Sequence, residues 1–186
     1  MNIFVLDTNP ETAAQMQCDK HIPKMILECA QMMVSALRRY GVTDEYLVDK
    51  GVVTKTGTPY KETHKNHPCT RWAGDSRDNF KWLARHAQSL LTEYSNRFDK
   101  VHACNGPVHI MSCKDHIIPE GGLTQFALAM PDEYRPEPID GETVYHAYPK
   151  FAIKAYQKYY HSKTFAKWEK GRPAPDWWKG LTGTVI

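Results

Sequence analysis

The sequence predicts an all-α protein that folds as one mostly helical domain over residues 1–186, with a short N-terminal strand and a small hairpin as minor additions. Three observations support this prediction. The chain has 186 residues, which suits a single domain. Hydrophobic residues make up 41% and charged residues 24%, a globular composition that excludes a disordered tail, a collagen-like fibre and a low-complexity linker. Apolar residues also recur at the three- and four-residue spacing of helices.

Residues 22–40 carry the clearest helical pattern. Their apolar positions follow the i, i+3, i+4, i+7 spacing of one buried stripe: Ile22, Met25, Ile26, Cys29, Met33, Ala36, Leu37 and Tyr40. Arg38 and Arg39 fall in the last turn and Gly41 ends the helix. Asp19 is the expected N-cap. The opposite face carries His21, Lys24, Glu28, Gln31 and Ser35.

The remaining elements are predicted from apolar spacing and from the positions of proline and glycine. Ile3–Leu6 is expected to form the short strand, and further helices are expected over residues 11–18, 70–98, 107–114 and 148–168. Gly74 marks a candidate break in the longest of these helices. Residues 41–66 and residues 131–147 are expected to be long loops, the first with a hairpin at Val52–Val53.

Charge, cysteine content and hydropathy restrict the class of protein further. The net charge of +3 is compatible with a polyanionic partner but does not by itself indicate one. The five cysteines are odd in number and form no CxxC pair, so we expect free thiols, some of them in the core. The apolar runs are only a few residues long and the start lacks a basic segment. We therefore expect no membrane span, no signal peptide and a cytoplasmic protein, in the host cytoplasm if the source is viral.

His21, Lys24 and Glu28 form the first candidate site. The seven residues from His21 to Glu28 are almost two helical turns, so both side chains point the same way, with Lys24 between them. A carboxylate beside an imidazole and an ammonium is suited to general acid–base catalysis or to stabilising a cationic intermediate. The alternative is a solvated helix face with ordinary i, i+4 ion pairs.

The segment that leads into the helix at residue 70 is the second candidate site. Pro68 favours an extended backbone at the preceding residue, so the segment is presented to solvent. We expect His64, Asn66 and His67 to recognise a base or a phosphate, and Trp72 to stack on a base. One alternative is a capped helix start with His67 bonded to the backbone. The other is a zinc site, although the spacing fits no standard finger, with ligands drawn from His64, His67, Cys69, His102 and Cys104.

Aromatic and basic residues are interleaved near the C-terminus. They are Tyr156, Lys158, Tyr159, Tyr160, His161, Lys163, Lys167, Trp168, Lys170 and Arg172. Such a mixture suits a nucleic acid, because the cations can contact the backbone while the rings stack on bases, but part of the tyrosine set must face the core. Trp177 and Trp178 are expected to clamp the tail onto the domain.

The N-terminus supplies a candidate nucleophile. The chain lacks the GxSxG, P-loop and GxGxxG motifs of common hydrolases, NTPases and dinucleotide-binding enzymes. Asn2 is a large second residue, so Met1 is expected to be retained. An α-amine is nucleophilic near neutral pH in its uncharged form.

The triplet Asp19-Lys20-His21, with Glu28 seven residues after the histidine, resembles the active-site helix of the phage endonuclease V type of pyrimidine-dimer DNA glycosylase. That helix carries an Asp-x-His triplet and a catalytic glutamate at the same spacing. Downstream, the run Glu93–Phe98 resembles the second long helix of that family, and the aromatic, basic C-terminal part resembles its Tyr-rich end. The chain is also similar to phage and bacterial proteins that share the CDKH and HxNHPxxxW patterns.

This resemblance implies a mechanism. In that family a free N-terminal amine attacks C1′ of the damaged nucleotide and forms a Schiff base, while the helix glutamate stabilises the sugar cation and assists strand cleavage. Transferred to this chain, the resemblance assigns the nucleophilic amine to Met1, the carboxylate to Glu28 and substrate positioning to His21.

Two features depart from the family pattern. The family's small N-terminal Thr, exposed by removal of Met, is replaced here by Met1-Asn2. The arginines that flank the family's glutamate and grip DNA phosphates correspond here to Leu27 and Gln31.

The sequence therefore predicts a DNA glycosylase-like enzyme that acts at the N-glycosidic bond of a nucleic-acid base or nucleotide, with Glu28 essential and AP lyase activity as a second step. The expected catalytic residues are Met1, His21 and Glu28, and the expected substrate-binding residues are Asn2, Lys24, His64, Asn66, His67 and Trp72. The expected partner is DNA or a nucleotide, and no cofactor or metal is predicted. The alternatives are a non-enzymatic phage-type protein that sequesters a nucleotide or a host protein, and a zinc-dependent enzyme that uses the His/Cys set.

Overall fold

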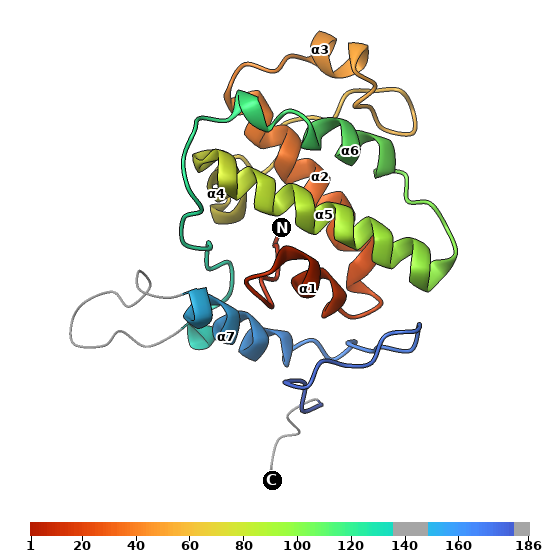
Figure 1. Cartoon of the computed structure of the whole chain (residues 1–186), viewed down its shortest axis with the longest axis vertical. Helices are drawn as coiled ribbons and strands as arrows, with labels where there is room; N and C mark the ends of the chain where they lie inside the picture. The colour runs from red at the N-terminus through yellow and green to blue at the C-terminus, as the bar shows by residue number, and fades with distance from the viewer. Residues whose placement is uncertain (136–148, 181–186) are drawn as a thin grey trace, which may run out of the picture.

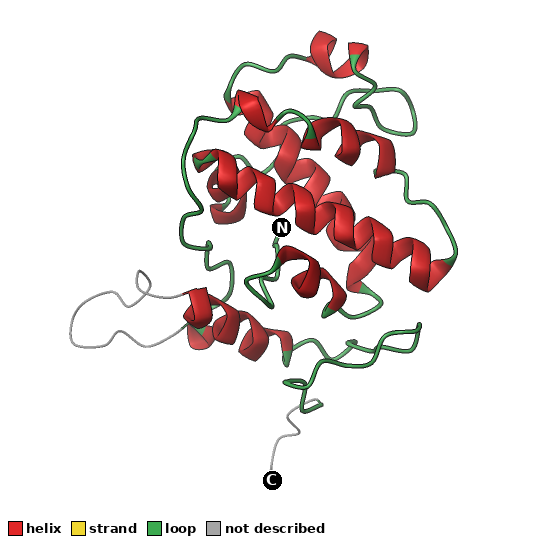
Figure 2. Cartoon of the chain, in the orientation of Figure 1, coloured by secondary structure: helices red, strands yellow, loops and turns green. Residues whose placement is uncertain are grey.

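The structure is a computed structural model that describes residues 1–135 and 149–180 (Figure 1). Its α-helices are α1 (Pro10–Gln15), α2 (His21–Arg39), α3 (Asp44–Asp49), α4 (Pro68–Asp75), α5 (Arg77–Phe98), α6 (Asn105–Ser112) and α7 (Pro149–Tyr160). Two 3-10 helices follow α6 in the chain, η1 (Asp115–Ile117) and η2 (Asp132–Tyr134). Figure 2 shows no strand in these two stretches of chain, so the all-α class is confirmed.

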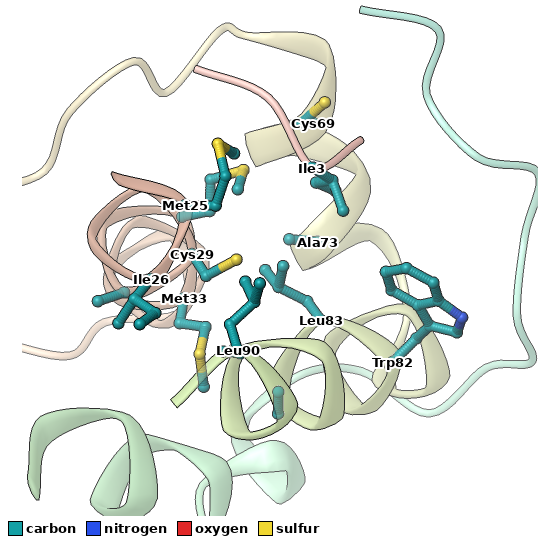
Figure 3. Packing of buried hydrophobic residues seen from close by; sticks show 14 of the residues in the cluster. Ile3, Met25, Ile26, Cys29, Met33, Cys69, Ala73, Trp82, Leu83 and Leu90 are labelled. Atoms are coloured by element: carbon teal, nitrogen blue, oxygen red, sulfur yellow. The ribbon is translucent and has the colours of Figure 1, made fainter. Parts of the chain in front are cut away.

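The core lies between α2, α5, α4 and the N-terminal segment. The two long helices pack on each other, with α1 against α5 and α4 against α2 (Figure 1). Figure 3 shows Met25 and Cys29 of α2 gathered with Leu83 and Leu90 of α5 and with Ile3. All five side chains are at most 1% exposed, and burial of each large apolar side chain stabilises the fold by about 1.5–3 kcal/mol. The predicted buried stripe of the helix at residues 22–40 is confirmed through Leu37.

The segment Ile3–Leu6 is not the predicted strand. Phe4 has a positive φ of 53°, which breaks the extended run. Asn2 Oδ1 accepts hydrogen bonds from the main-chain N–H groups of Ile3 (2.8 Å) and Phe4 (2.9 Å). The amides of Gln17 and Gln157 donate to the carbonyls of Ile3 (3.1 Å) and Leu6 (3.2 Å). Side chains therefore satisfy the polar backbone groups that a sheet partner would otherwise satisfy.

The helix predicted over residues 70–98 is two helices, and the break predicted near Gly74 lies at Ser76. Ser76 has an extended backbone (φ −151°, ψ 157°), and its Oγ accepts a hydrogen bond from the N–H of Asn79 at 3.2 Å. A serine in this conformation ends one helix and caps the next. Gly74 lies inside α4.

Asp19 does not cap α2 as predicted. The N-cap position is Lys20, which makes no capping hydrogen bond. The Asp19 carboxylate accepts instead from Arg97 Nη1 at 3.0 Å and from the main-chain N–H of Glu169 at 2.7 Å. Because a buried guanidinium is costly without a partner, Arg97 engages this carboxylate in place of the helix end.

The two predicted loops contain short elements. Residues 41–66 include α3, whose N-cap Thr43 accepts a hydrogen bond from the N–H of Tyr46 at 3.3 Å. Val53 and Pro59 form an isolated antiparallel bridge near the predicted hairpin. In the region 131–147, η2 covers the first residues, and residues 136–147 lie outside the described part.

The last helix is shorter than predicted. It ends at Tyr160, whereas the sequence predicted a helix to Trp168. Ser162 Oγ donates to the carbonyl of Tyr159 at 2.7 Å, and His161 Nδ1 lies 2.8 Å from the carbonyl of Gln157. These side chains engage the last carbonyls of α7, so the helix does not need to continue.

The C-terminal tail is held by aromatic contacts, as predicted. The Tyr160 ring lies within 6.4 Å of the rings of Trp168, Trp177 and Trp178. The indole N–H groups of Trp168 and Trp177 donate to Met16, at its carbonyl (3.1 Å) and its sulfur (3.4 Å). In the two stretches 1–135 and 149–180, none of the helices has the length together with the apolar character that crossing a bilayer requires.

Candidate active site

The N-terminus and a carboxylate of α2 meet at one point. The α-nitrogen of Met1 lies 3.6 Å from Oε2 of Glu28, and the main-chain N–H of Asn2 donates to the same oxygen at 2.6 Å. Lys24 Nζ lies 3.6 Å from Oε1 of Glu28. The Glu28 side chain is 13% exposed, so it is withdrawn from bulk water but remains accessible. The Met1 side chain is 1% exposed although the residue as a whole is half-buried, so solvent reaches its main-chain atoms.

Asn2 fixes the position of the amine. Its Nδ2 donates to the carbonyl of Ala129 at 2.6 Å, and its Oδ1 accepts the two turn hydrogen bonds described above. Tyr156 holds the segment that contains Ala129, because its O–H donates to the carbonyl of Ala127 at 2.6 Å and accepts from the N–H of Ala129 at 3.2 Å. The polar atoms of the Asn2 side chain are thus used within the fold. Its contribution is to place the amine beside Glu28.

Among the histidines of the described residues, His67 is the one on which both the Met1 ammonium and Glu28 act electrostatically. Burial lowers its pKa below the ordinary value, and the N-terminal ammonium and His64 lower it further, whereas Glu28 acts in the opposite direction. His67 is also the N-cap of α4, and its Nδ1 accepts a hydrogen bond from the N–H of Cys69 at 3.2 Å. The predicted alternative of a capped helix start is therefore confirmed, and the cap places a neutral imidazole within electrostatic range of the amine and the carboxylate.

His21 lies elsewhere, in an aromatic cluster at the start of α2. It is 3% exposed, its Nδ1 lies 2.7 Å from the hydroxyl of Tyr160, and its ring stacks on Phe4 with centroids 4.6 Å apart. Burial lowers the pKa of His21 to about 3, with further lowering by Lys24 and neighbouring lysines. The seven residues to Glu28 amount to about 10 Å along the helix axis. His21 is therefore a neutral, buried packing residue, and the described contacts do not join it to Glu28.

Three lysines surround this cluster: Lys20 and Lys24 are exposed and Lys163 is half-buried. The charges of Lys24, Lys163 and Lys20 all act on His21, which places them on one side of the molecule. Lys163 Nζ lies 3.6 Å from the ring centroid of Tyr159, and Lys20 Nζ lies 4.7 Å from that of Phe165. Cations grouped in this way favour a polyanionic ligand, and Lys24 of this group also pairs with Glu28.

Two of the predicted recognition residues are exposed, and one is not. His64 and Asn66 lie on the surface of the loop before α4. Trp72 is 4% exposed and packs against Trp82 and Phe126, with centroids 5.9 Å and 5.4 Å away. It lies four positions after Pro68 on the face of α4 that meets the core, so the predicted stacking of Trp72 on a base has no free ring face in this structure.

The candidate zinc ligands are not gathered into a site. Within residues 1–135 and 149–180, no group of three or more His, Cys, Asp or Glu side chains is placed to hold a metal ion. Burial raises the pKa of Cys69 to about 12, and Cys104 pairs with the hydroxyl of Tyr60 at 3.2 Å. All five cysteines are free thiols and four are buried, as the sequence predicted.

The surface also bears on the sequestering-protein alternative. That alternative expects a broad exposed aromatic patch. The exposed large apolar side chains of the described residues are Leu27, Val48, Val101, Leu123 and Phe165. Four of these five are aliphatic and they come from different parts of the chain, whereas the tryptophans and most tyrosines are buried or half-buried.

Several residues of this region were not found from the sequence. The carbonyl of Ala129 anchors Asn2, but a main-chain group carries no sequence signal. Lys163 was predicted as part of the basic C-terminal stretch, but its proximity to Lys20 and Lys24 comes only from the fold. The positive φ of Phe4 follows from the side-chain turn at Asn2, and asparagine within a run of apolar residues was the available signal.

An all-helical fold thus holds an α-amino group against a helix carboxylate, with the exposed Lys24 beside them. The family model described as pyrimidine dimer DNA glycosylase matches residues 1–105, and the chain belongs to that family. The match runs from the N-terminal amine through α5. Comparison with curated proteins and with solved structures gave no match.

Proposed function

We propose that this protein cleaves the N-glycosidic bond of a damaged pyrimidine nucleotide in DNA and then cuts the strand at the resulting abasic site. In this proposal the Met1 amine is the nucleophile and Glu28 is the essential carboxylate. The observation that carries it is the 3.6 Å separation between the Met1 nitrogen and Glu28 Oε2, held by the Asn2 hydrogen bond. Membership of the pyrimidine dimer DNA glycosylase family supports DNA as the substrate.

The first step replaces the base by the amine. The lone pair of the uncharged Met1 nitrogen forms a bond to C1′, and the C1′–N bond to the base breaks. The base leaves with that electron pair and takes up a proton, while the attacking nitrogen loses one. Glu28 lies where it can accept the amine proton and stabilise the positive charge that develops on the sugar.

The second step opens the sugar and cuts the strand. The nitrogen lone pair forms the C1′=N double bond of a Schiff base as the C1′–O4′ bond breaks and O4′ takes up a proton. Glu28 can then remove a proton from C2′, and the resulting enamine expels the 3′ phosphate by breaking the C3′–O3′ bond. Water hydrolyses the remaining Schiff base and restores the amine.

Lys20, Lys24 and Lys163 supply contacts to the DNA backbone in this proposal. Lys24 is 66% exposed and its one described partner is Glu28, so it can exchange that carboxylate for a phosphate. Lys20 and Lys163 present two more charges on the same side. These cations take the place of the arginines that flank the glutamate in the family pattern.

Borohydride trapping tests the proposal. Borohydride reduces a Schiff base to a stable amine, so the protein incubated with abasic-site DNA and borohydride should form a covalent adduct. Mass mapping should place the adduct on the Met1 nitrogen. A chain extended by two residues before Met1 should lose trapping because the amine is displaced from Glu28, and the same extension at the C-terminus is the control. An adduct on a lysine, or base release without any adduct, would contradict the amine mechanism.

A further inference from the structure

A second concave site lies along the C-terminal half of α2. It has a volume of about 360 Å³, within the range of sites that bind small ligands. Its walls are α2, α4 and the loop before α4, and its polar lining includes Ser35, Arg39, Lys65, Asn66, Thr70 and Arg71.

The lining is electropositive. Arg39, Lys65 and Arg71 contribute three cations, and Glu62 is the one carboxylate of the lining. Arg39 Nη1 pairs with Asp75 of α4 at 2.8 Å. In the part of the chain that the structure describes, Lys65 and Arg71 have no carboxylate within ion-pair distance. Two of the three cations are therefore free to pair with an anionic ligand.

Hydrogen bonds hold this site in place. Ser35, which is 2% exposed, donates to the carbonyl of Thr63 and accepts from its N–H, both at 3.1 Å. These two bonds fix the loop that carries Lys65 against α2. Thr70 is 4% exposed, and its hydroxyl has no hydrogen-bond partner. A buried hydroxyl without a partner is destabilising, and an anionic oxygen in the cavity would accept its hydrogen.

Two residues that line this cavity lie on the same face of α2 as Glu28. Ser35 and Arg39 follow Glu28 by seven and eleven residues, close to whole numbers of turns, so the three side chains lie on one stripe of α2. At 1.5 Å per residue, Ser35 is about 10 Å and Arg39 about 16 Å from Glu28 along the axis. Phosphates of one strand of duplex DNA follow at about 3.4 Å along its axis, so a strand that runs along α2 covers this separation in about three to five nucleotides.

We propose that this cavity binds a backbone phosphate of the DNA strand, three to five nucleotides from the nucleotide that reacts at Glu28. The inference rests on the proposed function, because it uses Glu28 to locate the reacting nucleotide. Lys65 and Arg71 are the contact residues, and Ser35 positions the loop. Leu27, which adjoins Glu28 on α2, is an exposed apolar side chain, so the cations of the cavity provide the grip on the strand at this end of α2.

Equilibrium binding to duplex DNA that contains a tetrahydrofuran abasic analogue tests the proposal without turnover, because this analogue forms no Schiff base. The double variant Lys65→Ala/Arg71→Ala removes the pairing with this one phosphate. It should reduce the slope of log K against log salt by about 0.9 and weaken binding about eightfold at 0.1 M salt, and each single variant should give part of that loss. The matched control is the double variant Arg85→Ala/Lys100→Ala, on α5 and just after it, which should leave the slope unchanged. An equal loss in the control would overturn the proposal.

Neutral phosphates locate the contact. A methylphosphonate placed three to five nucleotides to one side of the analogue should weaken wild-type binding about eightfold and leave the Lys65→Ala/Arg71→Ala double variant unaffected. If methylphosphonates at all positions have no effect while inorganic phosphate or thymidine 5′-monophosphate competes in an Arg71-dependent manner, the cavity binds a free phosphate and the proposal is overturned. Failure of borohydride trapping with these binding results intact would instead remove the amine chemistry and leave the phosphate site.

Discussion

Two glutamates on the two long helices each have two cationic partners but lie in very different environments. Glu28 on α2 is 13% exposed, and its cationic partners, the Met1 amine and Lys24, each lie 3.6 Å away. Glu93 on α5 is 2% exposed, and it receives hydrogen bonds from Arg97 at 2.9 Å and from Arg172 at 2.6 Å. Burial alone would raise the pKa of Glu93, but the hydrogen bonds from Arg172 and Arg97 outweigh it and the pKa is lowered.

The difference shows how the same residue type serves two purposes. The oxygens of Glu93 are saturated by guanidinium groups in a closed network that also holds Asp19 and ties the tail to α5. The oxygens of Glu28 face looser cations, one of which is exposed and can move away. A carboxylate with unused capacity beside an amine can stabilise new charge, whereas a saturated one stabilises the fold.

The largest effect is expected for Glu28→Gln. If Glu28 stabilises charge and transfers protons, the rate of base release from dimer-containing DNA should fall about 10²–10⁴-fold. The amide still accepts the Asn2 hydrogen bond, so the free energy of unfolding should change by no more than about 1 kcal/mol. Single-turnover kinetics and thermal denaturation measure the two quantities, with Glu45→Gln on α3 as the control. A stable variant with full activity would remove Glu28 from the mechanism.

Glu93→Gln should show the opposite pattern. Removing one partner of a buried ion pair costs about 3–5 kcal/mol, which corresponds to a fall in Tm of about 10 °C for a chain of this size. Below that Tm the rate of base release should stay close to wild type. Glu169→Gln, whose side chain is 70% exposed, should leave Tm unchanged. Loss of activity in a fully stable Glu93→Gln protein would contradict the assignment of Glu93 to the stability of the fold.

The smallest effect is the pH dependence of stability, which separates a buried histidine from an exposed one. Burial lowers the pKa of His21 to about 3 and that of His86 to about 4, so the unfolded chain binds protons before the folded one. Their contribution to stability is present above pH 6.5 and is lost as the pH falls, by up to about 1.4 kcal/mol per pH unit for each histidine. Urea unfolding between pH 7 and pH 4.5 should show a shallower dependence for His21→Phe, and no change for the exposed His116→Gln. An unchanged slope in His21→Phe would show that His21 is not buried as a neutral ring.

Helices with strong periodicity could be predicted from the sequence, but several of their ends could not. The apolar stripe of α2 has the required spacing over five turns, so its existence and its buried face followed directly. Asp19 had the right chemistry for a cap, yet Arg97, 78 residues away in sequence, competes for its carboxylate. α4 ends at Ser76, whose extended backbone breaks the helix and whose Oγ caps α5. The glycine in the sequence had placed this break near Gly74, two residues earlier.

The candidate site divides in the same way. Glu28 and Lys24 are four residues apart on one helix, so local geometry alone brings them together. His21 shares their stripe by spacing, but Phe4 and Tyr160 enclose it. Trp72 follows a polar, presented segment, yet its own turn of helix faces Phe126 in the core.

The sequence by itself determined the helical class, the long buried stripe of α2, the free thiols and the carboxylate that faces away from that stripe, because helical periodicity and residue chemistry act over a few neighbouring positions. Only the tertiary structure decided that the Met1 amine lies against Glu28, that His67 rather than His21 is within electrostatic range of both, and that Lys65 and Arg71 share a cavity with Arg39. Those outcomes depend on which segments pack together, since burial and charge pairing between distant residues have no local signature.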